Sequence, residues 1–155
     1  MSAYWTTNPT AGFTHDPAAP LQDEFARLAQ LRGWTAGGKA FRREWAHCGR
    51  LEFEYHFGGQ PTLTGWQAMC AFVGVARADV PNSVTQCKEA LRKTFVNIVD
   101  LMDARRTGQP VKQHKSAKAL KKYTIDSGKI FPKEAAKRNG YLKVLLIEIF
   151  ATSTR

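Results

Sequence analysis

The sequence predicts an all-α protein, a compact bundle of five or six helices with an extended N-terminal arm. Three observations point to this fold class. Apolar residues recur at helical spacing through most of the chain after residue 20. Ser, Thr and Pro stand where helices begin, and Gly stands where they end. No alternation of apolar and polar residues is long enough to build a sheet. A chain of 155 residues fits one domain, so we expect an irregular arm over 1–20 and a single helical domain over 21–155.

The N-terminal arm is rich in Thr, Pro, Ala and Gly and shows no period. Such a composition is typical of irregular structure. Tyr4, Trp5 and Phe13 are the side chains that would dock the arm onto the helical body.

Two helices are predicted in the next part of the chain. Leu21, Phe25 and Leu28 follow helical spacing, and Gly33 ends that helix. A second helix is predicted over roughly 38–57, because an apolar face lies opposite a charged face and a Gly-Gly pair follows.

Two capping boxes open the central helices. Thr64 with Gln67 predicts the start of a short apolar helix that closes at Gly74. Ser83 with Gln86 predicts the start of a longer helix that reaches Met102. The β-branched residues at 96, 98 and 99 allow a break there, which would give two helices instead of one.

The last third of the chain predicts two further helices separated by a turn. One covers 116–123, and the turn lies at 126–128. Pro132 suits the first turn of a final helix. Gly140 allows an interruption within that helix. The segment Leu142–Phe150 is apolar on nearly every side, so we expect it to be buried centrally or covered by a partner.

The net charge of +10 lies in one basic segment, residues 104–143. This segment holds twelve basic residues and two acids, whereas residues 1–103 hold ten of each. A field that concentrated attracts polyanions, chiefly nucleic acid or an anionic membrane face. The alternative is a solvated surface that only keeps the protein in solution.

A set of short motifs resembles a family of short single-domain proteins from filamentous fungi. The matching pieces are His15-Asp16-Pro17, Phe25, Arg32-Gly33-Trp34, Phe53, Phe57-Gly58, Leu63, Trp66-Gln67, Cys70, Pro81, Ser83, Cys87-Lys88, Val96-Asn97-Ile98, Asp100-Leu101, Tyr123-Thr124, Gly128-Lys129 and Phe131-Pro132-Lys133. The resemblance covers most of the chain from residue 13 to about 147 and implies a compact single domain of fungal origin. It implies no activity and no catalytic residue.

The basic segment predicts an interface for the backbone of DNA or RNA. Lys115, Lys118 and Lys122 share one helix face, and Lys129, Lys133 and Lys137 are spaced by four. Each Lys would meet phosphate as a point charge, with little sequence specificity. The predicted contact residues are Arg105, Arg106, Lys112, Lys115, Lys118, Lys121, Lys122, Lys129, Lys133, Lys137 and Arg138.

Two motifs known from other binding proteins have weaker support. Residues 62–102 give two capped helices joined by a loop, as in a helix-turn-helix, but residues 74–81 are long for that turn. Gly33–Lys39 matches the first seven positions of a P-loop. A P-loop needs a preceding strand and a following Ser or Thr, and here a predicted helix precedes and Ala40 follows. We interpret this match as chance.

The cysteines and acids predict no metal, no cofactor and no catalytic centre. Cys48, Cys70 and Cys87 lie in apolar patterns without the paired spacings of zinc modules, which indicates free buried thiols in a reducing compartment. Glu52, Glu54 and His56 alternate along a predicted helix, which argues against a paired-acid site.

Three polar residues near the middle of the chain receive structural roles. Asp100 and Asp103 are predicted to form surface ion pairs with Arg105 and Arg106. Asn97 lies between apolar residues and is interpreted as a buried polar group that fixes a helix contact.

Taken together, these patterns favour a nonenzymatic nucleic-acid-binding module inside the cell, in the nucleus or the cytoplasm. The alternative is a protein-interaction or homodimerisation module that uses the apolar C-terminal helix. Contact with an anionic membrane surface ranks third, because no large apolar face accompanies the cations. We expect no membrane insertion, since the longest apolar run is far too short, and no signal peptide at residues 1–14.

Overall fold

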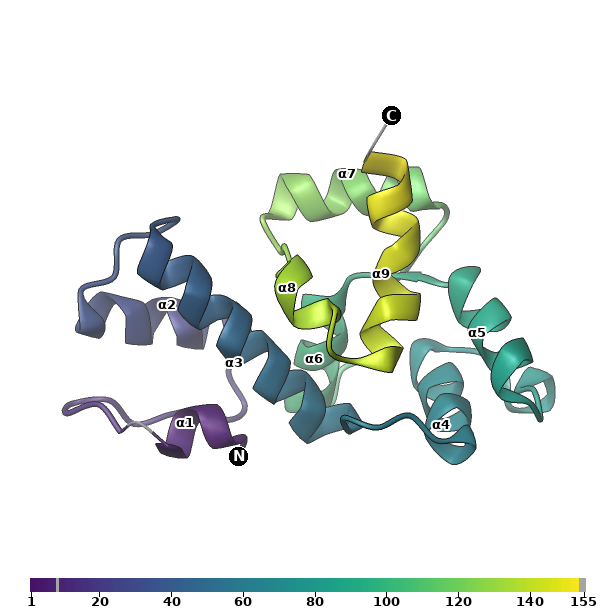
Figure 1. Ribbon diagram of the computed structural model, residues 1–155, viewed down its shortest axis with the longest axis horizontal. Helices are drawn as coiled ribbons and strands as arrows, with labels where there is room; N and C mark the ends of the chain where they lie inside the picture. The colour runs from purple at the N-terminus through teal and green to yellow at the C-terminus, as the bar shows by residue number, and fades with distance from the viewer. Residues whose placement is uncertain (8, 154–155) are drawn as a thin grey trace.

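A computed structural model describes the backbone of residues 1–7 and 9–153 and the side chains of residues 1–7 and 9–146. Within these residues the chain forms nine α-helices, a 3-10 turn and one two-stranded antiparallel pair (Figure 1). The helices are α1 (Ala3–Thr7), α2 (Leu21–Arg32), α3 (Lys39–Phe57), α4 (Leu63–Val73), α5 (Val84–Arg92), α6 (Ile98–Thr107), α7 (Ala117–Ser127), α8 (Lys133–Ala136) and α9 (Gly140–Ser153). The predicted helical fold class is confirmed.

The prediction of five or six helices was too low. The N-terminal arm contains the short helix α1, and the long central helix divides in two. Between α5 and α6 the chain turns extended, and strand β1 (Phe95–Val96) pairs with strand β2 (Gln113–His114). The break falls in the β-branched cluster, where the sequence allowed one. The final helix also divides, since α8 ends before Gly140 and α9 begins there.

The helix caps follow the sequence with one correction. Ser83 caps α5 as predicted, with its Oγ accepting a hydrogen bond from the backbone amide of Gln86 at 3.2 Å. The cap predicted at Thr64 was wrong, because α4 already begins at Leu63. Thr62 holds the extended backbone of an N-cap residue and accepts from the amide of Gly65 at 3.0 Å.

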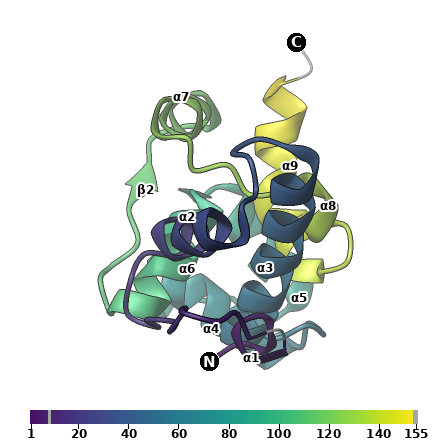
Figure 2. The same ribbon diagram turned by 90° about the vertical axis from the view of Figure 1, so that its left-hand side faces the viewer.

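Helix α3 runs through the middle of the molecule and contacts α1, α2, α6 and α8 (Figures 1 and 2). Its inward face contributes Trp45, Cys48 and Phe53 to the core, where Phe25 of α2 and Met102 of α6 meet them. The prediction of buried, free cysteines is confirmed for Cys48, Cys70 and Cys87.

The N-terminal arm is docked by the three aromatic residues predicted for this role. Tyr4 is buried and lies edge-on to Trp5 at 5.1 Å between ring centroids, while Trp5 stacks on His15 at 3.9 Å. Phe13 packs against the core as well, with the Arg27 guanidinium 4.2 Å from its ring centroid. The arm therefore forms part of the packed body.

The first half of helix α9, whose side chains the structure describes, is packed into the core. Tyr141, Leu142 and Val144–Leu146 are buried among α5, α7 and α8. This half leaves no apolar face for a partner. The side chains at 147, 149 and 150, which the dimer hypothesis also used, lie outside the described residues. No helix in the described part of the chain combines the length and apolar character that crossing a membrane requires.

Two buried asparagines join the helices. The Nδ2 of Asn97 donates to Thr124 Oγ1 at 3.1 Å and to the Lys129 carbonyl at 2.9 Å, while its Oδ1 accepts from the amide of Asp100. The prediction that Asn97 fixes a helix contact is confirmed. Asn139 is completely buried, donates to the carbonyl of Gly58 and caps the first turn of α9.

We predict that Asn97→Ala lowers the free energy of unfolding by about 2–4 kcal/mol, because it removes a helix cap and leaves the partly buried carbonyl of Lys129 without its donor. Urea unfolding followed by circular dichroism measures this loss. The matched control is Asn82→Ala, since Asn82 is exposed. A loss no greater than that of the control would contradict the role given to Asn97.

Candidate nucleic-acid interface

The eleven predicted contact residues do not gather on one surface. The structure separates them into four groups. A pair forms ion pairs with Glu52 and Asp100 (Arg106, Lys129), a row lies on or just before α7 (Lys115, Lys118, Lys121, Lys122), a group lies on or just after α8 (Lys133, Lys137, Arg138) and two residues lie beside aromatic rings (Arg105, Lys112). Only the second and third groups place several cations together.

Arg106 points into the protein. Its side chain is 2% exposed, and its Nη1 lies 3.1 Å from Glu52 Oε2. Its Nε donates to the carbonyl of Ala19 and its Nη2 to that of Asp16, so the guanidinium also holds the arm. Arg106 is therefore not available to a polyanion on the surface.

The partner of Arg106 is the centre of a buried polar cluster. Glu52 accepts hydrogen bonds from Ser2 Oγ at 2.7 Å and Trp5 Nε1 at 2.6 Å, and His56 Nε2 lies 3.1 Å from its Oε2. Burial by itself raises the pKa of Glu52. The hydrogen bonds from His56, Ser2 and Trp5 and the charge of Arg106 outweigh burial and lower this pKa to about 2.

Sequence reasoning missed this cluster, although a signal was present. Glu52 and His56 are one helical turn apart and therefore do share a face of α3. Glu54 turns instead toward Arg50, at 3.5 Å, so the two glutamates do not form an acid pair.

Lys129 is also engaged within the fold. Its Nζ lies 2.8 Å from Asp100 Oδ1 and 3.0 Å from the hydroxyl of Tyr123, and hydrogen bonds to these two groups raise its pKa. The predicted pairs of Asp100 and Asp103 with the neighbouring arginines are therefore wrong. Asp100 faces α7, whereas Asp103 accepts from the amide of Leu21 at the start of α2.

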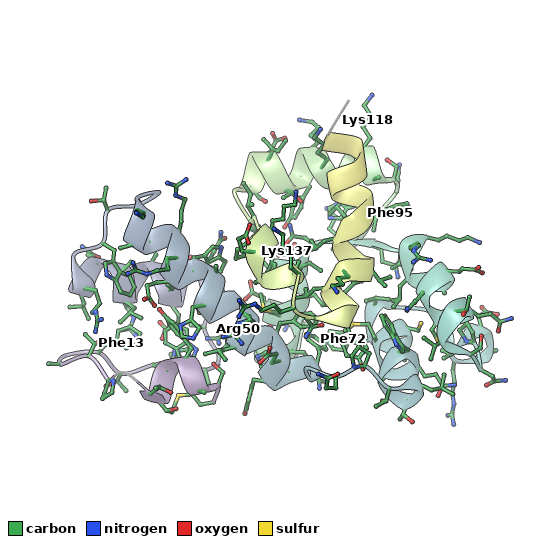
Figure 3. The ribbon with its side chains drawn as sticks, in the orientation of Figure 1. Phe13, Arg50, Phe72, Phe95, Lys118 and Lys137 are labelled. Carbon is green, nitrogen blue, oxygen red and sulfur yellow. The ribbon has the colours of Figure 1, made fainter. Side chains whose placement is uncertain are left out.

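Helix α7 carries an exposed row of lysines. Ser116 caps this helix, so Lys115 lies just before its first turn and Lys118 just within it. Lys118 projects away from the body (Figure 3). Lys122 is exposed and pairs with Asp126 at 2.7 Å. The row is cationic and lies along one exposed helix.

A cationic cleft of about 430 Å³ lies between α3 and α8. One wall carries Arg43, His47 and Arg50 of α3, and the other carries Lys137 and Arg138 after α8. Figure 3 labels Arg50 on α3 and Lys137 at the end of α8. Ala46 and Ala135 lie between the walls, where their small side chains leave depth. We name this feature the α3–α8 cleft.

The local sequence sets the width of the α3–α8 cleft. Gly49 on α3 allows the ring of Phe131 to approach, since a Cβ at Gly49 would lie 3.1 Å from that ring. Trp45 Nε1 donates to the carbonyl of Ile130 at 3.0 Å. These contacts hold the segment leading into α8 against α3 and bring cations far apart in sequence to one place.

The charge of the α3–α8 cleft is only partly neutralised. Glu134 is the acid in its lining, and its carboxylate lies 3.4 Å from Lys137 Nζ. Arg50 meets Glu54 at 3.5 Å beside the cleft. Arg43 lies 3.8 Å from the carboxylate of Glu44. All three pairs are long for charge-assisted hydrogen bonds. The Glu134–Lys137 pair is also exposed to solvent, so an incoming anion displaces these contacts at little cost.

Sequence reasoning missed the α3 wall of this cleft. Arg43, His47 and Arg50 follow one exposed helix face at spacings of four and three, which is a visible signal. They lie in residues 1–103, where basic and acidic residues are equal in number, so a count of charge along the sequence does not single them out.

The other predicted motifs do not form sites. The helix α2 precedes Gly33, so the P-loop match lacks the strand that its chemistry needs. In the described part of the chain, no group of three or more His, Cys, Asp or Glu residues is placed to hold a metal ion. Helices α4 and α5 pack together, but residues 74–83 join them with a 3-10 turn, a longer link than a helix-turn-helix uses.

No protein-family model, curated protein or solved structure matches this chain. The resemblance to a family of short fungal domains stays a prediction.

We predict that Arg106→Gln lowers the free energy of unfolding by about 3–5 kcal/mol, because it leaves the Glu52 carboxylate buried without its charge partner. The neighbouring Arg105→Gln is the matched control and costs less than about 1 kcal/mol, since Arg105 is exposed. Thermal and urea unfolding of both variants measure the difference. Equal losses would contradict the assignment.

We further predict an acid-dependent loss of stability from Glu52. Its folded pKa of about 2 lies below the ordinary value of 4.5, so its stabilising contribution is complete above pH 4.5 and disappears as the pH falls toward 2. The contribution amounts to about 3 kcal/mol. Urea unfolding at several pH values should show a weaker pH dependence in Glu52→Gln over this window. An unchanged dependence would contradict the prediction.

Proposed function

We propose that the chain is a nonenzymatic nucleic-acid-binding module that contacts the phosphate backbone with little sequence specificity. The observation that carries the proposal is the α3–α8 cleft, where Arg43 and Arg50 face Lys137 and Arg138. Cations on two walls of one hollow suit a ligand that carries repeated negative charge. On this proposal the protein acts where nucleic acid is found, in the nucleus or the cytoplasm.

The kinds of cation in the cleft fit phosphate chemistry. Three of the four are arginines, whose planar guanidinium donates two parallel hydrogen bonds to a phosphate group. The His47 ring in the same lining offers a further donor to phosphate or sugar oxygens. Nothing in the lining resembles a nucleophile with a matched base, so we assign binding and no reaction.

The lysine row on α7 supports a polymeric ligand. In both ribbon views α7 lies above α3 and α8 (Figures 1 and 2), and no residue of α7 lines the cleft. On this proposal a strand of several nucleotides contacts both the cleft and the lysine row. The contact residues on this proposal are Lys115, Lys118, Lys122, Lys133, Lys137 and Arg138, with Arg43 and Arg50 added by the structure.

We predict that neutralising the α3 wall reduces the salt dependence of binding. In the double variant Arg43→Gln/Arg50→Gln, the slope of log K against log salt on duplex DNA becomes smaller in magnitude by about 2, because two phosphate contacts are lost. Fluorescence anisotropy titrations over a range of salt concentrations measure the slope.

The control for this prediction is Arg92→Gln/Lys93→Gln. It removes the same charge from exposed positions at the end of α5, away from the cleft. Equal effects of the two double variants would show that net charge alone drives binding. No binding of wild-type protein to DNA or RNA at low salt would contradict the proposed function.

A further inference from the structure

A second hollow lies at the C-terminal end of α3. This groove has a volume of about 510 Å³ and lies between the last turn of α3 and the helix α4. Its lining is mostly apolar, with Phe57, Ala68, Met69 and Phe72, and Arg105 of α6 stands at its edge. Figure 3 shows Phe72 between α4 and the end of α3. We name this feature the aromatic groove.

Arg105 lies beside both aromatic rings of the groove. Its guanidinium carbon lies 5.5 Å from the ring centroid of Phe57 and 5.2 Å from that of Phe72. Its Nη2 donates to the carbonyl of His56 at 3.2 Å. Arg105 is exposed, and no carboxylate of the described residues forms an ion pair with it.

We infer that the aromatic groove holds a base of a single-stranded nucleic acid whose phosphates lie in the α3–α8 cleft. This inference rests on the proposed function and narrows its ligand to a single strand. An apolar hollow lined by two aromatic rings beside a planar cation suits a nucleobase, which stacks on aromatic rings and on guanidinium groups. The guanidinium of Arg105, which no described carboxylate pairs, suits the phosphate that follows the base.

The position of the groove along α3 supports the connection. Seven residues, about two helical turns, separate Arg43 from Arg50 and Arg50 from Phe57. The three side chains therefore follow one face of the helix. From His47 to Phe57 the helix rises by about 15 Å, a span of a few nucleotides in an extended strand. A strand is therefore able to pass from the cleft to the groove without crossing to the other side of α3.

A duplex does not offer the same fit. Its bases are paired and stacked inside the helix, so none of them reaches a groove on the protein without being flipped out. A positively charged channel next to aromatic surfaces is the arrangement by which proteins bind single strands without reading their sequence. The cleft and the groove together provide these two parts.

The test compares strands that have the same phosphates with and without bases. Fluorescence anisotropy is measured at low salt with a single-stranded polyuridylate of about 12 nucleotides and with an abasic strand of equal length. We expect the abasic strand to bind about tenfold more weakly. Phe72→Leu and Arg105→Lys should each weaken binding of polyuridylate about five- to tenfold and leave binding of the abasic strand unchanged.

The controls separate stacking from folding and from charge. Phe72→Leu keeps an apolar side chain and Arg105→Lys keeps the positive charge, and a thermal melt of each variant reports whether the fold is intact. Tyr55→Leu removes an exposed ring on α3 that lies outside the groove lining, and it should change neither affinity.

The outcomes distinguish failure of base binding in the groove from failure of nucleic-acid binding altogether. Equal binding of the two strands, or equal weakening of both by Phe72→Leu, would overturn the inference while leaving charge-driven binding in place. Absence of binding to every strand and duplex would defeat the proposed function itself. A groove that takes an acidic peptide, with Phe72→Leu blocking the peptide alone, would also overturn the inference.

Discussion

The buried carboxylate of Glu52 is the contact on which the rest of the structure depends. It joins the N-terminal arm through Ser2 and Trp5, and it joins α6 to α3 through Arg106. A buried charge is tolerated only when its hydrogen bonds and its counter-charge are present together, so these segments hold one fixed arrangement around α3. The helix that results is the common wall of both candidate binding features.

The cationic cleft forms because α8 packs against the fixed helix α3. The basic segment alone is a set of lysines and arginines spread over several elements, and Arg106 and Lys129 already form ion pairs with Glu52 and Asp100. The packing of Phe131 on Gly49 places the start of α8 against α3, and Asn139 ties the turn after α8 to Gly58. Through these contacts, arginines from a neutral stretch of chain meet the basic segment and form a concave surface.

Local sequence signals predict most of the helices, and non-local contacts explain the rest. Ser83 and the helix-ending glycines mark boundaries because capping depends on residues a few positions apart. The burial of Arg106 is not visible in a charge count, since it is decided by Glu52, far away in sequence. The α3 wall was missed for the same reason: periodicity shows that Arg43 and Arg50 share a face but does not show that α8 packs beside it.

The central claim is that a polyanionic strand binds where α3 and α8 meet. A titration of isotope-labelled protein with a single-stranded oligonucleotide, followed by two-dimensional NMR, tests it most directly. The account predicts saturable shifts of the backbone amides around Arg43, His47 and Arg50 and around Lys137 and Arg138. Shifts confined to α7, or small shifts scattered evenly over all exposed lysines and arginines, would contradict it.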